Sequence, residues 1–387
     1  MKTPALAALA LSLAALPAAA QQGESGAYVV RLGRDTVLVE QFTRFADRIE
    51  GTIVGRSPRT AVRSYTATLR PDGTISRLEV VTRIPAAPEL LPQTMTVTMG
   101  ADSAGWRTQR GDTVREGKVA VTADATPWIA NAWGLAQPVI RAAQARGADS
   151  VAVPVVAAGQ RQTGTVSFIR RGPDSLLVRA ANGVTRARVD AQGRVLGAHS
   201  PESTFKADVE RVSSLDAGAI AAAWAARDRA GQGLGTLSPR DSVVGRIGGA
   251  DVSVAYGRPY MRGRRIVGQV VPYGQVWRTG ANEATHFRTD RDLMFGDTRV
   301  PAGSYTLWSI PGQDGWQLII NRQTGQWGTV YDPAQDLARI PVQSRRTPGP
   351  PVEQLTLSVE PDECGGGGVL AIEWENTRVT APFTVAP

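Results

Sequence analysis

The side chains with the greatest capacity for chemistry begin at Trp277, in the segment WRTGANEATHFRT. Arg278 carries a planar guanidinium that can bind a carboxylate, a phosphate or a planar polar group through two parallel hydrogen bonds. Asn282 and Glu283 add hydrogen-bonding oxygens beside it. The turn at 280–282 would direct backbone amides toward the same place. Together these groups indicate a small polar binding site.

Aromatic rings accompany these polar groups. Trp277, together with Tyr256 and Tyr273, offers apolar walls. Ligand sites in proteins combine such walls with a few polar groups that fix the orientation of the ligand. A carbohydrate would also fit, because sugars present apolar ring faces edged with hydroxyl groups. The site predicted for a small polar or carbohydrate-like ligand consists of Trp277, Arg278, Asn282, Glu283, Tyr256 and Arg258.

The charged members of this set have a structural alternative. Arg258, Arg278 and Glu283 could form an internal ion-pair lattice that fixes the ends of strands. A buried arginine needs such a partner, because its desolvation is otherwise uncompensated. The sequence leaves the ligand site and the lattice open.

The signatures of common enzymes are absent, so we expect a non-enzymatic protein without cofactor or metal. There is no Walker loop, no dinucleotide-binding glycine pattern after a strand and no Gly-x-Ser-x-Gly elbow. His199 and His286 are the only histidines, which excludes a multi-histidine zinc site. The alternative is a hydrolase centred on Glu283 and His286, with Asp290 or Asp292 as a second carboxylate.

The N-terminus has the pattern of a secretory signal peptide. Lys2 precedes an apolar run from Ala5 to Leu16 and then small residues that end at Ala20. The run is shorter than the ~20 residues that span a bilayer, so we expect no membrane span. Cleavage near Ala20 predicts a periplasmic or secreted protein. Cys364 is the only cysteine, which excludes an intrachain disulfide.

The net charge of +8 raises the question of an acidic partner. The basic residues are arginines apart from Lys2, Lys118 and Lys206, and acidic residues are interspersed among them. Nucleic-acid-binding proteins instead gather their basic residues on one patch or tail. We therefore expect no nucleic acid, and a small polar ligand or an envelope component as the partner.

Residues 24–215 predict an antiparallel β-rich domain, folded as a curved sheet or half-barrel. Apolar and polar residues alternate with the period of two that marks half-buried strands. The turn Pro71-Asp72-Gly73 predicts one hairpin, because proline presets the first turn dihedral and glycine accepts a positive φ. A second hairpin is predicted around Asp190–Gly193.

One helix should interrupt these strands. Thr126-Pro127 is typical of an N-cap followed by proline at the first helical position, and apolar residues then recur at helical intervals to Ala143. We expect Pro138 to kink or split this helix. Its stripe around Trp128 and Trp133 could cover a hollow, which makes a carrier of apolar ligands the third functional alternative.

Residues 216–242 predict a second helix, from about Ala217 to Ala230, followed by the flexible linker GQGLGTLSP. Alternation resumes in residues 243–387, with short strands, frequent turns and no helical period. That pattern indicates a β-sandwich or jelly roll. The whole fold is therefore predicted to be mainly β.

The motifs of this second domain carry a resemblance to a known family. The motifs are Tyr256-x-Arg258-Pro259, Gly263-Arg264, Val271-Pro272-Tyr273-Gly274, Trp277-Arg278-x-Gly280-Ala281-Asn282-Glu283-Ala284-Thr285, Pro301-Ala302-Gly303-x-Tyr305, Ile310-Pro311-Gly312, Asn321 with Gln326-Trp327-Gly328, and Trp374-Glu375-Asn376-Thr377. Over about residues 250–385 the chain resembles the bacterial envelope family called domain of unknown function 2911. The resemblance implies a secreted bacterial protein and implies no activity, because none is assigned to the family. The N-terminal domain lies outside it and has only a loose likeness to curved-sheet periplasmic carriers.

Overall fold

The computed structural model describes residues 23–386, apart from residues 146, 158–161, 204 and 363–365. The predicted signal peptide and Cys364 lie outside the described residues. Within them the chain is mainly β, with two α-helices and one short 3-10 helix, Pro333–Gln335. The predicted fold class is therefore confirmed. No helix of the described part is long and apolar enough to cross a membrane.

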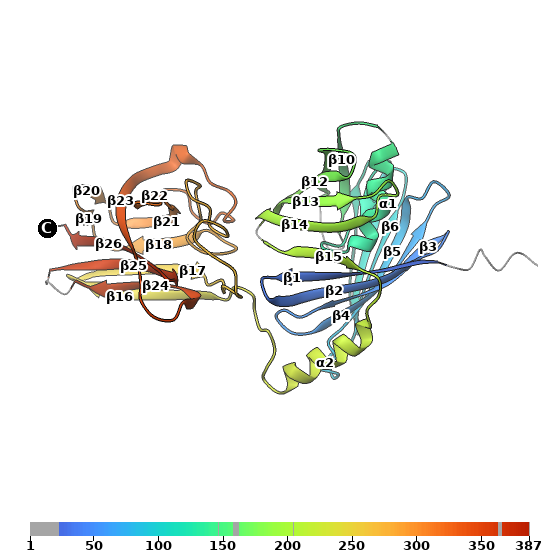
Figure 1. Ribbon diagram of the computed structural model, residues 1–387, viewed down its shortest axis with the longest axis horizontal. Coiled ribbons are helices and arrows are strands. Elements are labelled where there is room, and N and C mark those ends of the chain that lie inside the picture. Colours follow the sequence, from blue (N-terminus) through green and yellow to red (C-terminus); the bar gives the residue numbers. More distant parts are fainter. Residues whose placement is uncertain (1–22, 146, 158–161, 204, 363–365, 387) are drawn as a thin grey trace, which may run out of the picture.

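The first fifteen strands form one sheet, which we call the N-terminal body together with the two α-helices (Figure 1). Its strands are β1 Glu24–Leu32, β2 Asp35–Arg44, β3 Arg48–Gly55, β4 Ala61–Leu69, β5 Ile75–Arg83, β6 Gln93–Met99, β7 Ser103–Arg110, β8 Thr113–Ala120, β9 Thr126–Pro127, β10 Ser150–Val156, β11 Gly164–Arg170, β12 Ser175–Ala180, β13 Gly183–Val189, β14 Val195–Ser203 and β15 Asp208–Val212. The hydrogen-bonded order runs from β8 back to β1 and then from β15 back to β9. Two meanders therefore meet where β1 pairs with β15.

Both hairpins predicted in this sheet are confirmed. The turn at 71–73 joins β4 to β5, and the turn at 190–193 joins β13 to β14. Gly73 and Gly193 both have a positive φ, of 81° and 72°. These are the backbone conformations for which glycine is suited.

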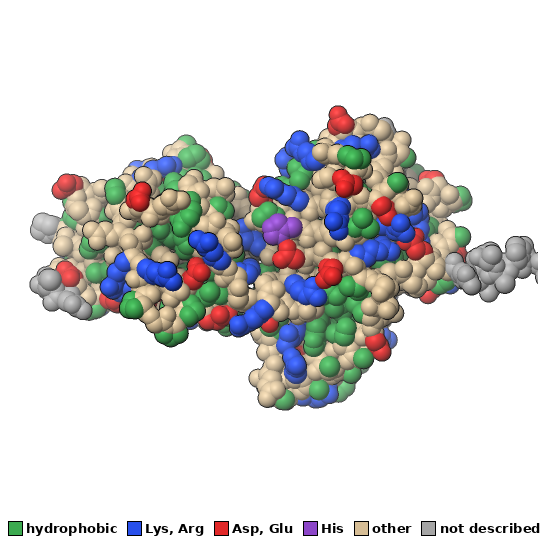
Figure 2. Space-filling model, viewed as in Figure 1, with side chains coloured by type: hydrophobic (Ala, Val, Ile, Leu, Met, Phe, Trp, Pro, Cys, Tyr) green, Lys and Arg blue, Asp and Glu red, His purple; other side chains and the backbone are tan. Residues whose placement is uncertain are grey.

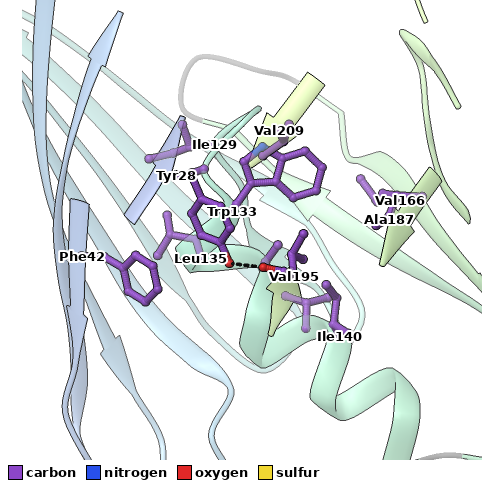
Figure 3. Close-up of a cluster of buried hydrophobic side chains, with 14 of the residues drawn as sticks. Tyr28, Phe42, Ile129, Trp133, Leu135, Ile140, Val166, Ala187, Val195 and Val209 are labelled. Atoms are coloured by element: carbon purple, nitrogen blue, oxygen red, sulfur yellow. Dashed lines mark hydrogen bonds between the residues drawn. The ribbon is translucent and has the colours of Figure 1, made fainter. Parts of the chain in front are cut away.

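Helix α1, Trp133–Ala145, packs on one face of the sheet against β1, β2 and β3. Figure 3 shows Trp133, Leu135 and Ile140 of this region among the side chains of the buried core. The hydroxyl of Tyr28 on β1 donates a hydrogen bond to the carbonyl of Val195 on β14, at 3.0 Å (Figure 3). This bond links the two meanders inside the core.

The predicted start of α1 was wrong, because its cap comes from a distant strand. Residues 126–127 form β9, which pairs in parallel with β10. The Glu40 carboxylate of β2 accepts hydrogen bonds from the backbone N–H groups of Trp133, at 2.6 Å, and Gly134, at 3.1 Å. These are the first amides of the helix, which have no partner within it. Pro138 lies inside one helix and does not divide it.

Helix α2, Ala217–Arg229, confirms the second predicted helix. Its N-cap is Asp216, whose side chain accepts a hydrogen bond from the amide of Ala219 at 2.9 Å. Ala217 and Ala221 pack on the sheet face opposite to α1. The linker then runs from α2 to the C-terminal body (Figure 1).

The remaining strands form the C-terminal body around a core of its own. They are β16 Arg240–Ile247, β17 Ala250–Gly257, β18 Thr285–Thr289, β19 Leu293–Phe295, β20 Thr298–Val300, β21 Gly303–Ile310, β22 Trp316–Asn321, β23 Asp336–Arg346, β24 Val352–Pro361, β25 Gly367–Glu375 and β26 Thr377–Val385. The order is β16-β17-β18-β21-β22-β23-β26-β19-β20, and β25 joins β24 to β26. Gly245 of β16 faces Val359 of β24, so the predicted sandwich takes the form of a nearly closed barrel.

Glu40 also predicts how stability depends on pH. Its side chain is fully buried, and burial raises its pKa from 4.5 to about 7 against the opposing effect of hydrogen bonds from Tyr65 and the α1 amides. Because the folded-state pKa lies above the unfolded one, this contribution to stability is complete below pH 4.5 and is lost as pH rises through 7. The difference corresponds to roughly 3 kcal/mol.

We therefore expect Glu40→Gln to flatten the pH dependence of thermal unfolding between pH 4.5 and 8. Glutamine keeps an acceptor oxygen for α1 but does not titrate. The exposed Glu79 on β5 supplies the matched control, and Glu79→Gln should leave the wild-type slope unchanged. Equal slopes in wild type and Glu40→Gln would contradict the raised pKa.

Candidate ligand site

The two bodies touch where the β1–β2 turn meets the turn around Arg262, and Arg34 also pairs with Glu353 of β24 at 3.8 Å. The backbone N–H of Arg34, in the β1–β2 turn, donates to the carbonyl of Arg262 at 2.8 Å. The Asp35 carboxylate pairs with the Arg262 guanidinium at 2.6 Å, and that side chain is only 6% exposed. Gly33 has a φ of +61°, and a Cβ there would lie 2.2 Å from the Arg262 carbonyl oxygen. Only glycine permits this close approach of the two backbones.

A cleft of about 1050 Å³ lies between the two bodies. The N-terminal body contributes Leu32, Ser57 and Arg186 together with residues 199, 201–203, 205 and 206. The linker contributes residues 236–238, and the C-terminal body contributes parts of the segment 259–282, residues 328–329 and Trp374. Figure 2 shows basic side chains along the gap between the bodies. The cleft is larger than the hollow of about 450 Å³ beside Arg265 and the hollow of about 60 Å³ beside Trp133.

Three residues that were predicted for the site line this cleft: Trp277, Arg278 and Asn282. Trp277 is held by two backbone hydrogen bonds of 2.8 Å to Ser309 of β21. Its ring stacks on that of Trp374, with centroids 6.0 Å apart and an interplanar angle of 19°. The two rings form an apolar wall whose position is fixed by the barrel.

The turn after Trp277 is rigid, and it positions Arg278. Thr279 and Asn282 both have a positive φ, of 50° and 64°. The buried hydroxyl of Thr279 donates to the hydroxyl of Ser309 at 3.0 Å. The carbonyl of Asn282 accepts a hydrogen bond from the amide of Gly328 at 2.9 Å. These contacts fix both ends of the turn to neighbouring segments.

The guanidinium of Arg278 has no acidic partner among the described residues. Its Nη1 donates to the carbonyl of Gly328 at 3.3 Å, and its buried Nε lacks a hydrogen-bond partner in the described structure. Burial lowers the pKa of Arg278 to about 10, so the group stays charged at neutral pH. A Cβ at Gly328 would lie 2.0 Å from Cδ of Arg278, so the side chain packs directly on the glycine.

Two further cations face the same cleft, Arg264 and Lys206. Arg264 donates to the carbonyls of Met261, at 2.9 Å, and Tyr260, at 2.7 Å. Burial first and then the charge of Arg262 lower its pKa to about 10. Like Arg278, it forms no ion pair with any described carboxylate.

Lys206 supplies the cation from the N-terminal body. Its Nζ donates to the carbonyl of Pro201. Burial, followed by the charges of Arg278 and Arg264, lowers the pKa of Lys206 to about 8. The charges of both arginines therefore act on Lys206, and we call Lys206, Arg264 and Arg278 the basic triad.

Acidic groups near the cleft oppose the lowering of these pKa values, Glu353 and Asp208 for Arg264 and Glu202 for Lys206, but none of them forms an ion pair with the basic triad in the described structure. Glu202 is the one carboxylate found among the described lining residues, and it pairs with Arg186 at 2.6 Å. Asp208 pairs with His199 at 2.5 Å. The described part of the cleft therefore carries an excess of positive charge.

The structure places the other predicted binding residues away from the cleft lining. Tyr256 is 2% exposed in the barrel core, where its hydroxyl accepts a hydrogen bond from the amide of Leu357 at 2.9 Å. Arg258 pairs with Asp241 at 2.8 Å and donates to the carbonyl of Leu355 at 3.0 Å. Both side chains hold strand ends together.

The expected lattice of Arg258, Arg278 and Glu283 does not form. Glu283 pairs with Arg240 instead, and its side chain is 51% exposed. Both partners, Arg240 of Glu283 and Asp241 of Arg258, come from β16, which is distant in sequence, so local sequence gave no guide to them.

The alternative hypothesis of a hydrolase centred on Glu283 and His286 finds no support in the large cleft. His286 lies on β18, where burial and then the charge of Arg240 lower its pKa. Neither residue lines the cleft. Asp290 accepts a hydrogen bond from the amide of Asp251 at 2.7 Å, and Asp292 pairs with Arg299. Each candidate carboxylate is thus bound elsewhere.

The hollow lined by Trp128 and Trp133 measures about 60 Å³, far below the ~300–1,000 Å³ of most ligand pockets. In the described part of the chain no three His, Cys, Asp or Glu side chains are grouped so that they could hold a metal ion.

Sequence reasoning missed Lys206, Arg264 and Trp374 as cleft residues. Arg264 and Trp374 lay inside recognised motifs, and Lys206 stood out as one of three lysines in the chain. What joins them is the contact between the bodies, which no local pattern encodes.

Comparison with known proteins supports the resemblance in the C-terminal body. Residues 238–383 match the model of the family described as "Protein of unknown function (DUF2911)". No curated protein matches the chain. A crystal structure of a DUF1089 family protein from Pseudomonas aeruginosa is similar to part of it, with 12% sequence identity and a TM-score of 0.30. That similarity covers 43% of this chain and 90% of the other.

The contact between the bodies yields a stability prediction. We expect Asp35→Ala to lower the free energy of unfolding by roughly 3 kcal/mol, because it leaves the buried Arg262 charge without its partner. The exposed pair Asp47–Arg48, at 3.0 Å, supplies the control. Asp47→Ala should cost less than ~1 kcal/mol. Equal shifts of the thermal unfolding midpoint would show that the Asp35 pair is no stronger than a surface pair.

Proposed function

We propose that this chain is a secreted or periplasmic, non-enzymatic binding protein that holds a small anionic ligand in the cleft between its two bodies. The observation that carries the proposal is the basic triad. Lys206, Arg264 and Arg278 converge on one cleft, and no described carboxylate pairs with any of them.

An anionic ligand would compensate the unpaired positive charge of the cleft. Burying a cation without a partner is costly, and placing like charges near one another adds repulsion. A bound carboxylate or phosphate would offset both the desolvation cost and the repulsion. Arginine is suited to this role because its planar fork can donate two hydrogen bonds to such a group.

The walls of the cleft add a second requirement on the ligand. Trp277 and Trp374 present stacked rings, and Asn282 adds an amide. A cleft of about 1050 Å³ exceeds the volume of a bare inorganic anion. The favoured ligand therefore has an anionic group and an apolar part, and an acidic sugar derivative belongs to this class.

The sequence pattern at the N-terminus supports an extracytoplasmic location. A basic residue, a short apolar run and small residues up to Ala20 are typical of a secretory signal peptide. A soluble metabolite or an anionic envelope component would both be accessible to a protein exported in this way.

Titration calorimetry with phenyl phosphate and with phenol tests the proposal. The two probes share a ring and differ in charge, so we expect phenyl phosphate to bind and phenol to bind at least tenfold more weakly. Arg278→Gln should weaken phenyl phosphate binding by roughly tenfold or more, since a hydrogen bond to a charged group contributes about 1.5–3 kcal/mol. Raised salt should weaken binding as well.

The matched control is Arg288→Gln, an exposed arginine on β18 outside the cleft lining. It removes the same charge and should leave the affinity unchanged. Equal weakening by both variants would show that only overall charge matters. Binding of neutral sugars without binding of phenyl phosphate or benzoate would overturn the anionic class of ligand.

A further inference from the structure

Lys206 stands apart from the other basic residues in type and in position. Lysine occurs three times in the chain, at Lys2, Lys118 and Lys206, among 43 basic residues. Lys118 lies exposed on β8, whereas Lys206 lies partly buried in the cleft between the bodies. The one lysine of the described cleft therefore sits beside two arginines.

An amine offers chemistry at this place that a guanidinium does not. A guanidinium stays protonated in proteins, whereas an amine that loses its proton gains a nucleophilic lone pair. Desolvation and nearby cations are the two factors that activate lysine toward carbonyl groups. Both act on Lys206, where burial and then Arg278 and Arg264 lower the pKa to about 8.

The hydrogen bond to Pro201 holds the amine in place. Nζ donates to the Pro201 carbonyl, and a neutral amine can keep that donation while its lone pair stays available for attack. The two carboxylates nearest in sequence are already paired, Asp208 with His199 at 2.5 Å and Glu202 with Arg186 at 2.6 Å. No described carboxylate forms an ion pair with Lys206 that would hold it protonated.

We propose that Lys206 is a carbonyl-reactive amine, which forms an imine with a 2-oxo acid whose carboxylate is bound by Arg264 and Arg278. The inference rests on the proposed function, because it requires the cleft to hold an anion. It narrows the ligand to an anion that carries a carbonyl group next to its carboxylate.

The reaction balances without any further reactant. The Nζ lone pair attacks the carbonyl carbon, and the carbonyl oxygen becomes the hydroxyl of a carbinolamine. Loss of that hydroxyl with a proton releases one water and leaves a carbon–nitrogen double bond. Both protons of the water come from the neutral amine. The carboxylate takes no part in bond making and keeps its contacts to the arginines.

Reductive trapping tests the inference on the full mature protein. Phenylpyruvate is added with sodium cyanoborohydride, which reduces an imine to a stable secondary amine. We expect a mass increase equal to phenylpyruvate minus one oxygen atom, located at Lys206 by peptide mapping. At pH 7.5 trapping at Lys206 should be roughly tenfold or more faster than at Lys118, which is exposed on β8.

Phenyllactate is the matched ligand control, since it has the same ring and carboxylate but a hydroxyl in place of the carbonyl. It should compete with phenylpyruvate without forming an adduct. Lys206→Arg keeps the positive charge but has no amine that can form an imine, so it should lose the adduct. Arg278→Gln should slow trapping at Lys206 and leave trapping at Lys118 unchanged.

The outcomes separate the two proposals. Binding of phenyllactate and phenylpyruvate with no faster trapping at Lys206 than at Lys118 would overturn the imine and leave the anion site standing. Absence of binding by both ligands and of trapping would overturn the two proposals together. Fast trapping that Arg278→Gln does not slow would overturn the role of Arg278 in holding the carboxylate. The comparison with Lys118 is made within wild-type protein, so it needs no variant to fold.

Discussion

The ion pair between Asp35 and Arg262 is the constraint on which the candidate site depends. Each body has its own hydrophobic core, so neither needs the other in order to bury its apolar side chains. Their relative position therefore depends on polar contacts and on the linker. The approach of Gly33 to the Arg262 carbonyl leaves no room for a side chain, which makes the contact close and specific. The cleft exists because the two bodies meet at one turn and stand apart beside it.

The basic triad is an exception to how this chain handles its many arginines. Arg378 lies between Glu360 and Glu373, at 2.8 and 3.0 Å, and Arg258 pairs with Asp241. Partners for buried cations are thus common in the protein, yet the cleft supplies none to the triad from the described residues. Natural sequences tend to break such local rules at functional sites. The absence of a carboxylate partner for the triad among the described residues is therefore a stronger indication of a binding site than the charge of any single residue.

Local sequence patterns predicted much of the fold, whereas they predicted only some of the residues that line the cleft. The hairpin turns were predictable because Gly73 and Gly193 act within a few residues, and α2 was predictable because its alanine-rich run is continuous in sequence. The start of α1 was not, because its cap is Glu40, which lies on β2 and far away in sequence. Trp277, Arg278 and Asn282 were found because one rigid turn carries all three. Lys206 joins them only through the contact between the bodies.

Division of the triad between two bodies links ligand binding to their arrangement. Lys206 belongs to the N-terminal body, and Arg264 and Arg278 belong to the C-terminal one. Without a bound anion, Lys206 is repelled by the two arginines. This repulsion opposes the approach of the two bodies that the Asp35–Arg262 pair favours. A bound anion attracts cations from both sides and so removes that opposition. A ligand shifts the equilibrium between two arrangements of the bodies only by the difference in its affinity for them. An anion that contacts both bodies would therefore favour the arrangement in which the three cations face the same cleft. In the proposed site the two arginines would bind the charge of the ligand, and Lys206 would react with its neighbouring carbonyl group.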